Sequence, residues 1–333
     1  MHYESFMKKE EDSAINEAST YWTRTFSQLR ASPSIIKVWW ALPFIHFWES
    51  ERITGCPGSD KWSWFKDNYV PRTLDRGLVL GCADGLIERQ LYQMGFCNYF
   101  DSFDITGELL GEARKKGNEL AQGHFRYRLA DLNKFEFPEQ NAYQLVIAHY
   151  VFHHIQNLEF LFENIKRALQ PGGLILLDEY IGPNRFAMDE KTYRVAKDVY
   201  DSLPLRYRRR LPDNRLKRVG KQLLHRLPYS RFKYYAKEFA VADPSEVART
   251  DPSEAVRSED IVPLIKKNFE VLFSAYWGAT IFPTIYALIA DNIDISREED
   301  MNILRYIWDK DKEKIEAGEI PSYCVWMVLK NRK

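Results

Sequence analysis

Two histidines that could act as general bases follow an apolar stretch of the chain. His149 comes directly after the strand predicted at 144–148, and His153 lies one helical turn further along the same face. A neutral imidazole has a pKa suited to accepting a proton near neutrality. Both rings could instead pack and hydrogen-bond within the fold, and the sequence leaves that alternative open, more so for His153 than for His149.

The His-x-x-x-His spacing of this pair also occurs in metal sites. No carboxylate directly follows His149, however, and the sequence offers no evident third ligand. We therefore expect no metal ion at this position.

A second group of polar side chains ends the apolar strand predicted at 173–179. Asp178, Glu179 and Tyr180 follow one another there, at an edge of the sheet that should face a ligand. Ionised carboxylates at this position could orient an acceptor molecule or a histidine base. A helix cap or a turn network would explain the same residues equally well.

A turn bounded by glycines follows another apolar strand, predicted at 78–81, and indicates a nucleoside site. Gly81 and Gly85 permit close approach of a ligand to the backbone, and the next helix offers unpaired N–H donors at its start. Asp104 follows about twenty residues after the turn, where it could accept hydrogen bonds from two ribose hydroxyls. Because the turn lacks the G-x-G-x-x-G spacing of dinucleotide sites, a dinucleotide oxidoreductase is disfavoured.

The elements that must position these residues alternate between short apolar strands and amphipathic helices. This alternation predicts an α/β fold whose mostly parallel sheet binds ligands at the carboxyl ends of its strands. The expected strands are 78–81, 99–104, 125–129, 144–148, 173–179, 270–277 and 322–330, and the expected helices are 85–94, 107–116, 157–169, 258–267 and 297–316.

Two helical segments outside this alternation divide the chain into four expected parts. Residues 1–74 hold six of the nine tryptophans and should form an aromatic subdomain or lid. Residues 183–257 form a helical insertion after the fifth strand, placed to cover an acceptor. The α/β core would then consist of residues 75–182, which bind the nucleoside, and residues 258–333, which complete the sheet.

The composition of the 333-residue chain sets broad limits on its class. Its hydrophobic content of 45 % suffices for one large domain with additions or for two domains, and its 47 basic and 47 acidic residues cancel. The four cysteines form no C-x-x-C pair, which favours reduced thiols in a cytoplasmic protein. We expect neither a signal peptide nor a transmembrane segment.

The charge is uneven within residues 206–233, which we call the basic segment. This segment carries eleven lysines or arginines against the single acid Asp213. A solvated helical face is the commonest explanation, and a site for an anionic acceptor such as a nucleotide sugar comes second. Nucleic acid or an anionic membrane comes last, because no recognised RNA-binding module accompanies the tyrosines of the segment.

Taken in order, the motifs of residues 76–182 resemble those of the class I S-adenosylmethionine-dependent methyltransferases. The matching positions are Gly81, Cys82, Ala83, Asp84 and Gly85 in the first motif, Asp104 and Ile105 at the ribose-binding strand end, Asp131 and Leu132 in the adenine segment, 146–155 in the fourth-strand motif, and 169–179 in the fifth. The resemblance implies a Rossmann-like fold with seven strands, the last antiparallel. It also implies S-adenosyl-L-methionine as cofactor, held by these residues together with His149.

Two positions depart from the pattern of that family. Val79 stands where an acid is usual, so another residue must bind the ammonium group of the cofactor. Ala83 replaces a middle glycine, and its methyl group is tolerable if the backbone at that residue is not left-handed.

The resemblance implies methyl transfer, in which the protein aligns a nucleophile, excludes water and removes a proton. We expect O-methylation of a small, oxygen-rich acceptor, rather than methylation of nitrogen or carbon. The candidate catalytic residues are His149, His153, Asp178 and Glu179. An RNA methyltransferase that uses the basic segment, or a non-catalytic binding protein with a degenerate fold, are the alternatives.

Two further segments, 178–185 and 251–254, resemble a bacterial subgroup associated with glycans or specialised metabolites. This resemblance implies that Arg185 and Arg257 lie on the acceptor side, together with Tyr180. A guanidinium fork can bind a carboxylate, a phosphate or a pair of sugar hydroxyls. The acceptor would then be a sugar, a glycan or a specialised metabolite.

Overall fold

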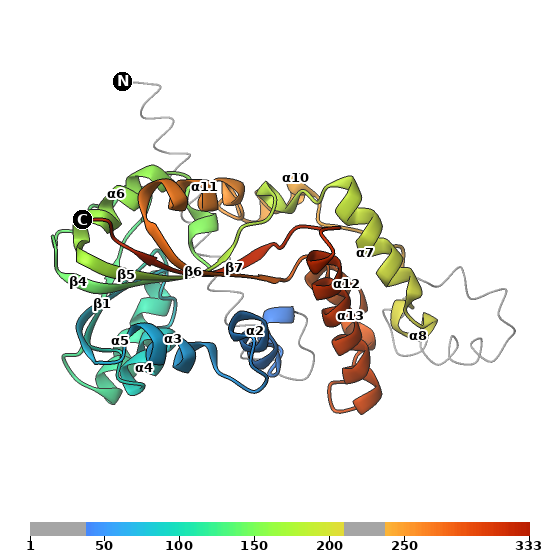
Figure 1. Ribbon diagram of the computed structural model, residues 1–333, viewed down its shortest axis with the longest axis horizontal. Helices are drawn as coiled ribbons and strands as arrows, with labels where there is room; N and C mark the ends of the chain where they lie inside the picture. The colour runs from blue at the N-terminus through green and yellow to red at the C-terminus, as the bar shows by residue number, and fades with distance from the viewer. Residues whose placement is uncertain (1–37, 210–236) are drawn as a thin grey trace, which may run out of the picture.

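A seven-stranded sheet runs through the molecule in the order β3-β2-β1-β4-β5-β7-β6 (Figure 1). The computed structural model describes residues 38–209 and 237–333. Neighbouring strands pair in parallel, except that β7 is antiparallel to both β5 and β6. The strands are β1 Leu74–Leu80, β2 Cys97–Asp104, β3 Phe125–Leu129, β4 Tyr143–His149, β5 Leu169–Tyr180, β6 Glu270–Gly278 and β7 Cys324–Lys330. This arrangement confirms the predicted α/β fold and its antiparallel last strand.

Helices cover both faces of the sheet. In Figure 1, α6 and α11 lie on one face, whereas α2, α3, α4 and α5 lie on the other. The central strands are therefore buried on both sides, which explains why Leu78, Val79 and Leu80 form a continuous apolar run. The helices are α2 Ile45–Thr54, α3 Lys61–Tyr69, α4 Leu86–Gln93, α5 Gly107–Leu120, α6 Leu158–Ala168, α7 Glu190–Ser202, α8 Leu205–Arg208, α10 Pro244–Thr250, α11 Ser258–Asn268, α12 Phe282–Ile289 and α13 Glu298–Glu316.

Short 3-10 turns complete the described elements. They are η1 Trp39–Ala41, η2 Phe152–His154, η3 Asn184–Phe186 and η5 Ala290–Asn292. Among the described helices, none is long and apolar enough to cross a membrane.

The predicted elements differ from the observed ones mainly at their boundaries and at one helix. Strand β5 begins at Leu169 instead of 173, because Leu169 already pairs with Tyr143 on β4. The residues between Leu169 and Leu174 form a bulge, in which Gly172 has φ +72°. Helix α12 was not predicted. Its sequence is apolar on all sides, so it lacks the one-sided pattern that identifies a surface helix, and its buried side chains explain that composition.

A buried arginine fixes the N-terminal helix α2 to the end of the sheet. Arg52 Nη1 donates to the carbonyl of Trp277 on β6 at 2.8 Å and to Asp311 Oδ2 on α13 at 2.9 Å. Asp311 Oδ1 also accepts hydrogen bonds from the backbone N–H groups of Thr280 and Ile281. Because every oxygen of this buried carboxylate is hydrogen-bonded, the contact can hold three distant segments together.

Two of the predicted segments lie partly outside the described residues. In the N-terminal part, only residues 38–74 are described, and they contain η1, α2 and α3. Of the basic segment, only residues 206–209 are described. There Arg206 pairs with Glu299 and Arg208 pairs with Asp201 on the surface.

Candidate active site

A cavity of about 1760 Å³ opens where the five parallel strands β1 to β5 end. Ligand pockets commonly measure ~300–1,000 Å³, so this one has room for a cofactor and a second molecule. Most of the predicted site residues line it, namely Gly81, Cys82, Ala83, Asp84, Asp104, Ile105, Asp131, Leu132, His149, His153, Tyr180 and Arg185. Gly85, Asp178, Glu179 and Arg257 are not part of its lining.

The glycines of the first turn are required by packing within the protein. Gly81 has φ +66°, and a Cβ there would lie 2.6 Å from Val151 Cγ2. Gly85 has φ +74°, and a Cβ would lie 2.7 Å from the Tyr127 hydroxyl. Both contacts are shorter than atoms tolerate, so each glycine permits a left-handed turn and the close approach of a neighbouring side chain. Gly81 also lines the cavity, so the predicted approach of a ligand to its backbone stays a prediction.

The condition that we set for Ala83 is not met. Its φ of 47° lies in the left-handed region, which disfavours a residue with a Cβ by roughly 1–2 kcal/mol. The Ala83 N–H donates to Asp104 Oδ2 at 2.8 Å, which helps to hold this conformation. The turn therefore stores strain at a point that faces the cavity.

Asp104 at the end of β2 is the polar centre of this wall. Its Oδ2 accepts from Ala83 N, and its Oδ1 accepts from Thr106 N at 2.7 Å. Burial raises the pKa of Asp104, and the surrounding backbone N–H groups oppose that shift. Each carboxylate oxygen has a second lone pair, so Asp104 can still accept hydrogen bonds from a bound ligand.

Glu88, a residue that the sequence analysis did not single out, lies behind the turn. It belongs to the first turn of α4 and is fully buried. Burial raises its pKa to about 7, although backbone hydrogen bonding opposes the shift. The negative charge of Glu88 adds to the burial that raises the pKa of the Cys82 thiol. Cys82 is thus held in its neutral, unreactive form.

His149 ends β4 on the opposite wall of the cavity. Its Nε2 lies 3.5 Å from Asp178 Oδ2, and its ring lies 6.0 Å from the ring of Trp62. Desolvation lowers the pKa of His149 to about 4; the charge of Lys61 lowers it further, while Asp178 acts in the opposite direction. Since 28 % of the side chain is exposed, a neutral imidazole is accessible from the cavity near neutrality.

A buried lysine from α3 organises the residues behind His149. Lys61 Nζ donates to Glu49 Oε2 at 2.9 Å and to Asp178 Oδ2 at 2.6 Å. Trp277 Nε1 donates to the other oxygen of Asp178 at 3.2 Å. These contacts make Asp178 a positioning residue, because its carboxylate is only 1 % exposed and does not reach the cavity. No sequence motif indicated Lys61 or Glu49, because both residues lie far from Asp178 along the chain.

Glu179 positions the turn that follows β4 by accepting hydrogen bonds from it. Its Oε2 accepts from the backbone N–H groups of Val151 and Phe152, at 2.9 and 2.6 Å. Its Oε1 accepts from Tyr180 N and from His153 Nδ1. Because Glu179 is completely buried, it fixes η2 and the ring of His153 without touching the cavity.

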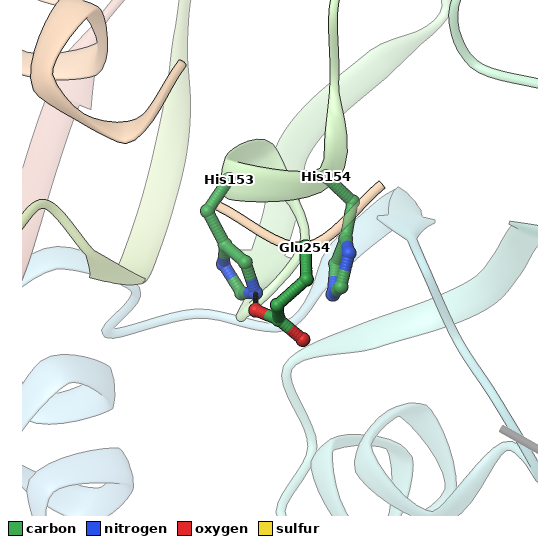
Figure 2. Close-up of side chains that lie close together, drawn as sticks. All are labelled: His153, His154 and Glu254. Atoms are coloured by element: carbon green, nitrogen blue, oxygen red, sulfur yellow. Dashed lines mark ion pairs between the residues drawn. The ribbon is translucent and has the colours of Figure 1, made fainter. Parts of the chain in front are cut away.

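His153, His154 and Glu254 lie together on the cavity wall, as Figure 2 shows. Glu254 comes from the loop between α10 and α11, and its Oε1 lies 3.3 Å from His153 Nε2. Burial opposes a charge on His153, but the carboxylates of Glu179 and Glu254 outweigh it and raise the pKa of His153 to about 10. Sequence analysis named His153 but not His154 or Glu254 as site residues.

The predicted acceptor-side arginines are engaged within the protein. Arg185 lines the cavity, yet its guanidinium donates to the carbonyls of Pro252 and Glu254, both at 2.8 Å. Arg257 lies outside the cavity lining and forms a two-pronged ion pair with Glu159, at 2.7 and 2.8 Å. Arg185 thus holds the loop that carries Glu254, and Arg257 pairs with Glu159 on α6. These contacts differ from the predicted contacts with an acceptor.

Comparison with known proteins identifies the central part of the chain. The family described as "Methyltransferase domain" matches residues 78–177. Malonyl-[acyl-carrier protein] O-methyltransferase 2 of Ilyobacter polytropus is 24 % identical over 122 residues, which cover 37 % of this chain and 46 % of that protein. An uncharacterized methyltransferase of Schizosaccharomyces pombe is 31 % identical over 122 residues, covering 33 % of this chain and 41 % of that protein. The matches thus span less than half the length of these two relatives.

Among solved structures, phosphoethanolamine N-methyltransferase 2 of Haemonchus contortus, in complex with S-adenosyl-L-methionine, is 16 % identical to the chain. That comparison covers 87 % of this chain and 56 % of the other, with a TM-score of 0.43. The family match covers the strands and turns from β1 to β5 that form the cavity wall. Residues 78–177 thus form a methyltransferase domain, and both relatives are methyltransferases that match the chain over this central part.

Proposed function

We propose that the protein transfers a methyl group from S-adenosyl-L-methionine to a hydroxyl group of a small, oxygen-rich acceptor. The observation that carries this proposal is the cavity itself. One continuous space connects the Asp104 wall with the neutral imidazole of His149. A nucleoside-binding wall and a proton acceptor therefore face the same volume, as transfer between two bound molecules requires.

The residues on the Asp104 wall fit this cofactor. Asp104 retains lone pairs for ribose hydroxyls, and the apolar side chains of Ile105 and Leu132 can enclose an adenine ring. Val79 is buried beneath the turn and cannot bind the cofactor ammonium. The ammonium group would instead bind polar groups that line the cavity, such as the carboxylates of Asp84 and Glu49.

When bound, the cofactor supplies a methyl group that its sulfonium centre has already activated. The residues of the chain then position the acceptor and remove its proton. His149 accepts the hydroxyl proton, and Asp178, lying 3.5 Å from Nε2, stabilises the imidazolium that forms. Aromatic and apolar side chains at the mouth, including Trp39, Trp40 and Phe186, exclude water from the acceptor.

The cofactor can be tested by thermal unfolding with S-adenosylhomocysteine or NAD. S-adenosylhomocysteine should raise the melting temperature, by an amount that corresponds to about 2.7 kcal/mol at a hundredfold excess over its dissociation constant. NAD should have no effect. Asp104→Ala should abolish the shift, whereas Asp67→Ala, at an exposed position on α3, should retain it. Absence of any shift at millimolar S-adenosylhomocysteine would refute the cofactor assignment.

The role of His149 can be tested once an acceptor is known. A mass search of cell extracts for a metabolite that gains one methyl, only when protein and cofactor are both present, would identify it. His149→Ala should then lower the turnover number about 10²- to 10⁴-fold while the chain stays folded. His124→Ala, at the residue before β3 and outside the cavity lining, is the matched control. Unchanged turnover of His149→Ala would make that histidine structural.

A further inference from the structure

Two histidines and one glutamate from separate segments converge on the cavity wall. His153 and His154 belong to η2, and Glu254 belongs to the loop between α10 and α11 (Figure 2). One ligand atom from each residue lies within 4.8 Å of the corresponding atoms of the other two. Nitrogen from imidazole and oxygen from carboxylate are ligands that divalent transition metals share.

The partners of His153 fix which of its nitrogens faces Glu254. Glu179 Oε1 accepts from His153 Nδ1, so this nitrogen carries the proton. In the neutral ring, Nε2 then has a lone pair, and it faces Glu254 Oε1 at 3.3 Å. Two electron-pair donors at this distance repel each other unless a proton or a metal ion lies between them.

The same reasoning applies to His154. Ser253 Oγ donates its only proton to Asp251 Oδ1 at 2.6 Å, so it must accept from His154 Nδ1, which lies 3.0 Å away. The neutral ring of His154 then also carries its lone pair on Nε2. Histidines that bind metals commonly donate their other N–H to an oxygen in this manner, which orients the ring and increases its basicity.

The loop that carries Glu254 is held in place before any ion binds. Val256 N donates to the carbonyl of His153 at 3.0 Å, which ties the loop directly to η2. The guanidinium of Arg185 holds the carbonyls of Pro252 and Glu254. These contacts keep the carboxylate beside the two imidazoles, so the ligands need little reorganisation.

We propose that His153, His154 and Glu254 bind one divalent transition-metal ion, such as zinc, at the wall of the cavity. Around tetrahedral zinc, ligand atoms lie roughly 3.4 Å apart, and rotation of the flexible Glu254 side chain would close the wider spacing seen here. Three protein ligands leave a coordination position open to the cavity. Two nitrogen ligands favour zinc, cobalt, manganese or iron(II) over magnesium and calcium.

The use of this ion in catalysis rests on the proposed function. Placed in the same cavity as His149, it would bind the acceptor oxygen and make its proton more acidic. The proton would pass to His149 as the oxygen forms its bond to the methyl carbon. The bond from that carbon to sulfur breaks, and its electron pair remains on sulfur as a neutral thioether.

The site can be tested by calorimetric titration of Zn²⁺ into the metal-stripped full chain, without an added histidine tag. We expect one ion per chain, and Co²⁺ in its place should show the visible absorption of a site with nitrogen ligands. Glu254→Gln and His154→Gln should each weaken binding by about 100-fold or more. Ser253→Ala should weaken it by about tenfold, since it removes only the orienting contact. Glu246→Gln and His124→Gln are matched controls outside the cavity lining and should bind normally.

The thermal shift with S-adenosylhomocysteine shows whether each variant is folded. Zinc binding that is absent, or equally strong in the folded variants, would overturn the proposal and would mean that a proton alone joins His153 to Glu254. Failure of the shift in the unaltered chain would instead refute the cofactor assignment, and the zinc titration would remain informative.

Discussion

The two walls of the cavity are built in different ways. The cofactor wall, from Gly81 to Asp104, is held mainly by backbone geometry and by N–H groups that donate to one carboxylate. The acceptor wall depends on buried charges from distant segments, as in the contacts of Lys61 with Glu49 and Asp178. Local geometry thus shapes the proposed cofactor wall, whereas the proposed acceptor wall depends on contacts between segments that are far apart along the chain.

The largest effect should follow from breaking the buried charge cluster of the acceptor wall. Lys61→Met leaves Asp178 and Glu49 without their cation, and losing one partner of a buried ion pair costs about 3–5 kcal/mol of unfolding free energy. Lys116→Met removes a lysine that pairs with Asp84 beside the cofactor wall but is 39 % exposed. An exposed pair of this kind contributes about 0–1 kcal/mol.

Denaturant unfolding of the two lysine variants measures this difference directly. If the acceptor wall depends on its buried charges, Lys61→Met should lose several times more unfolding free energy than Lys116→Met. Equal losses would show that the acceptor wall does not depend on its buried charges. Because Lys61 also holds Asp178 near His149, any folded fraction of Lys61→Met should lose turnover.

The same contrast explains what the sequence could predict. The order of strands and helices followed from hydrophobic periodicity, and the glycine turn and Asp104 followed from their spacing, because these signals are local. Lys61 gave no signal, since its partner Asp178 lies 117 residues away. Glu254 likewise lies far from His153 along the chain, within the insertion of residues 183–257. Tertiary contacts decide the roles of such residues, and a single sequence does not display them.

Arg185 and Arg257 show a further limit of sequence reasoning. A guanidinium group suits an anionic acceptor, so both arginines were predicted to bind one. In the structure, Arg185 holds three carbonyls of the Asp251, Pro252 and Glu254 loop, and Arg257 pairs with Glu159. The guanidinium groups suggested an anionic ligand, but in the structure their partners are carbonyl and carboxylate groups of the protein itself.

The next largest effect should come from Glu88, the buried acid behind the cofactor wall. Its raised pKa should make the stability of the chain depend on pH. Its pKa is about 7 in the folded chain, against about 4.5 for an ordinary glutamate. The folded state therefore keeps a proton that the unfolded state has released. As the pH rises from 4.5 through 7, the chain should lose unfolding free energy, by about 3 kcal/mol in total.

Glu88→Gln should remove this dependence, because glutamine does not ionise. Urea unfolding at pH 5 and pH 8 should show the unaltered chain losing stability relative to the variant at the higher pH. Glu108→Gln, at an exposed position in the first turn of α5, should leave the dependence unchanged. Parallel pH curves for Glu88→Gln and the unaltered chain would contradict the raised pKa of this buried carboxyl.

The smallest effect should come from Ala83, where the cofactor wall carries its strain. Glycine at this position would relieve roughly 1–2 kcal/mol of left-handed strain but would add about 0.5–1 kcal/mol of conformational entropy to the unfolded chain. Ala83→Gly should therefore raise the unfolding free energy by about 0–1.5 kcal/mol, as measured in urea. Ala113→Gly, within helix α5, should lower it, because that alanine has ordinary helical geometry. If Ala83→Gly is as destabilising as Ala113→Gly, the left-handed backbone at Ala83 does not limit the stability of the turn. The hydrogen bonds to Asp104 would then be the feature that distinguishes the cofactor wall from the acceptor wall.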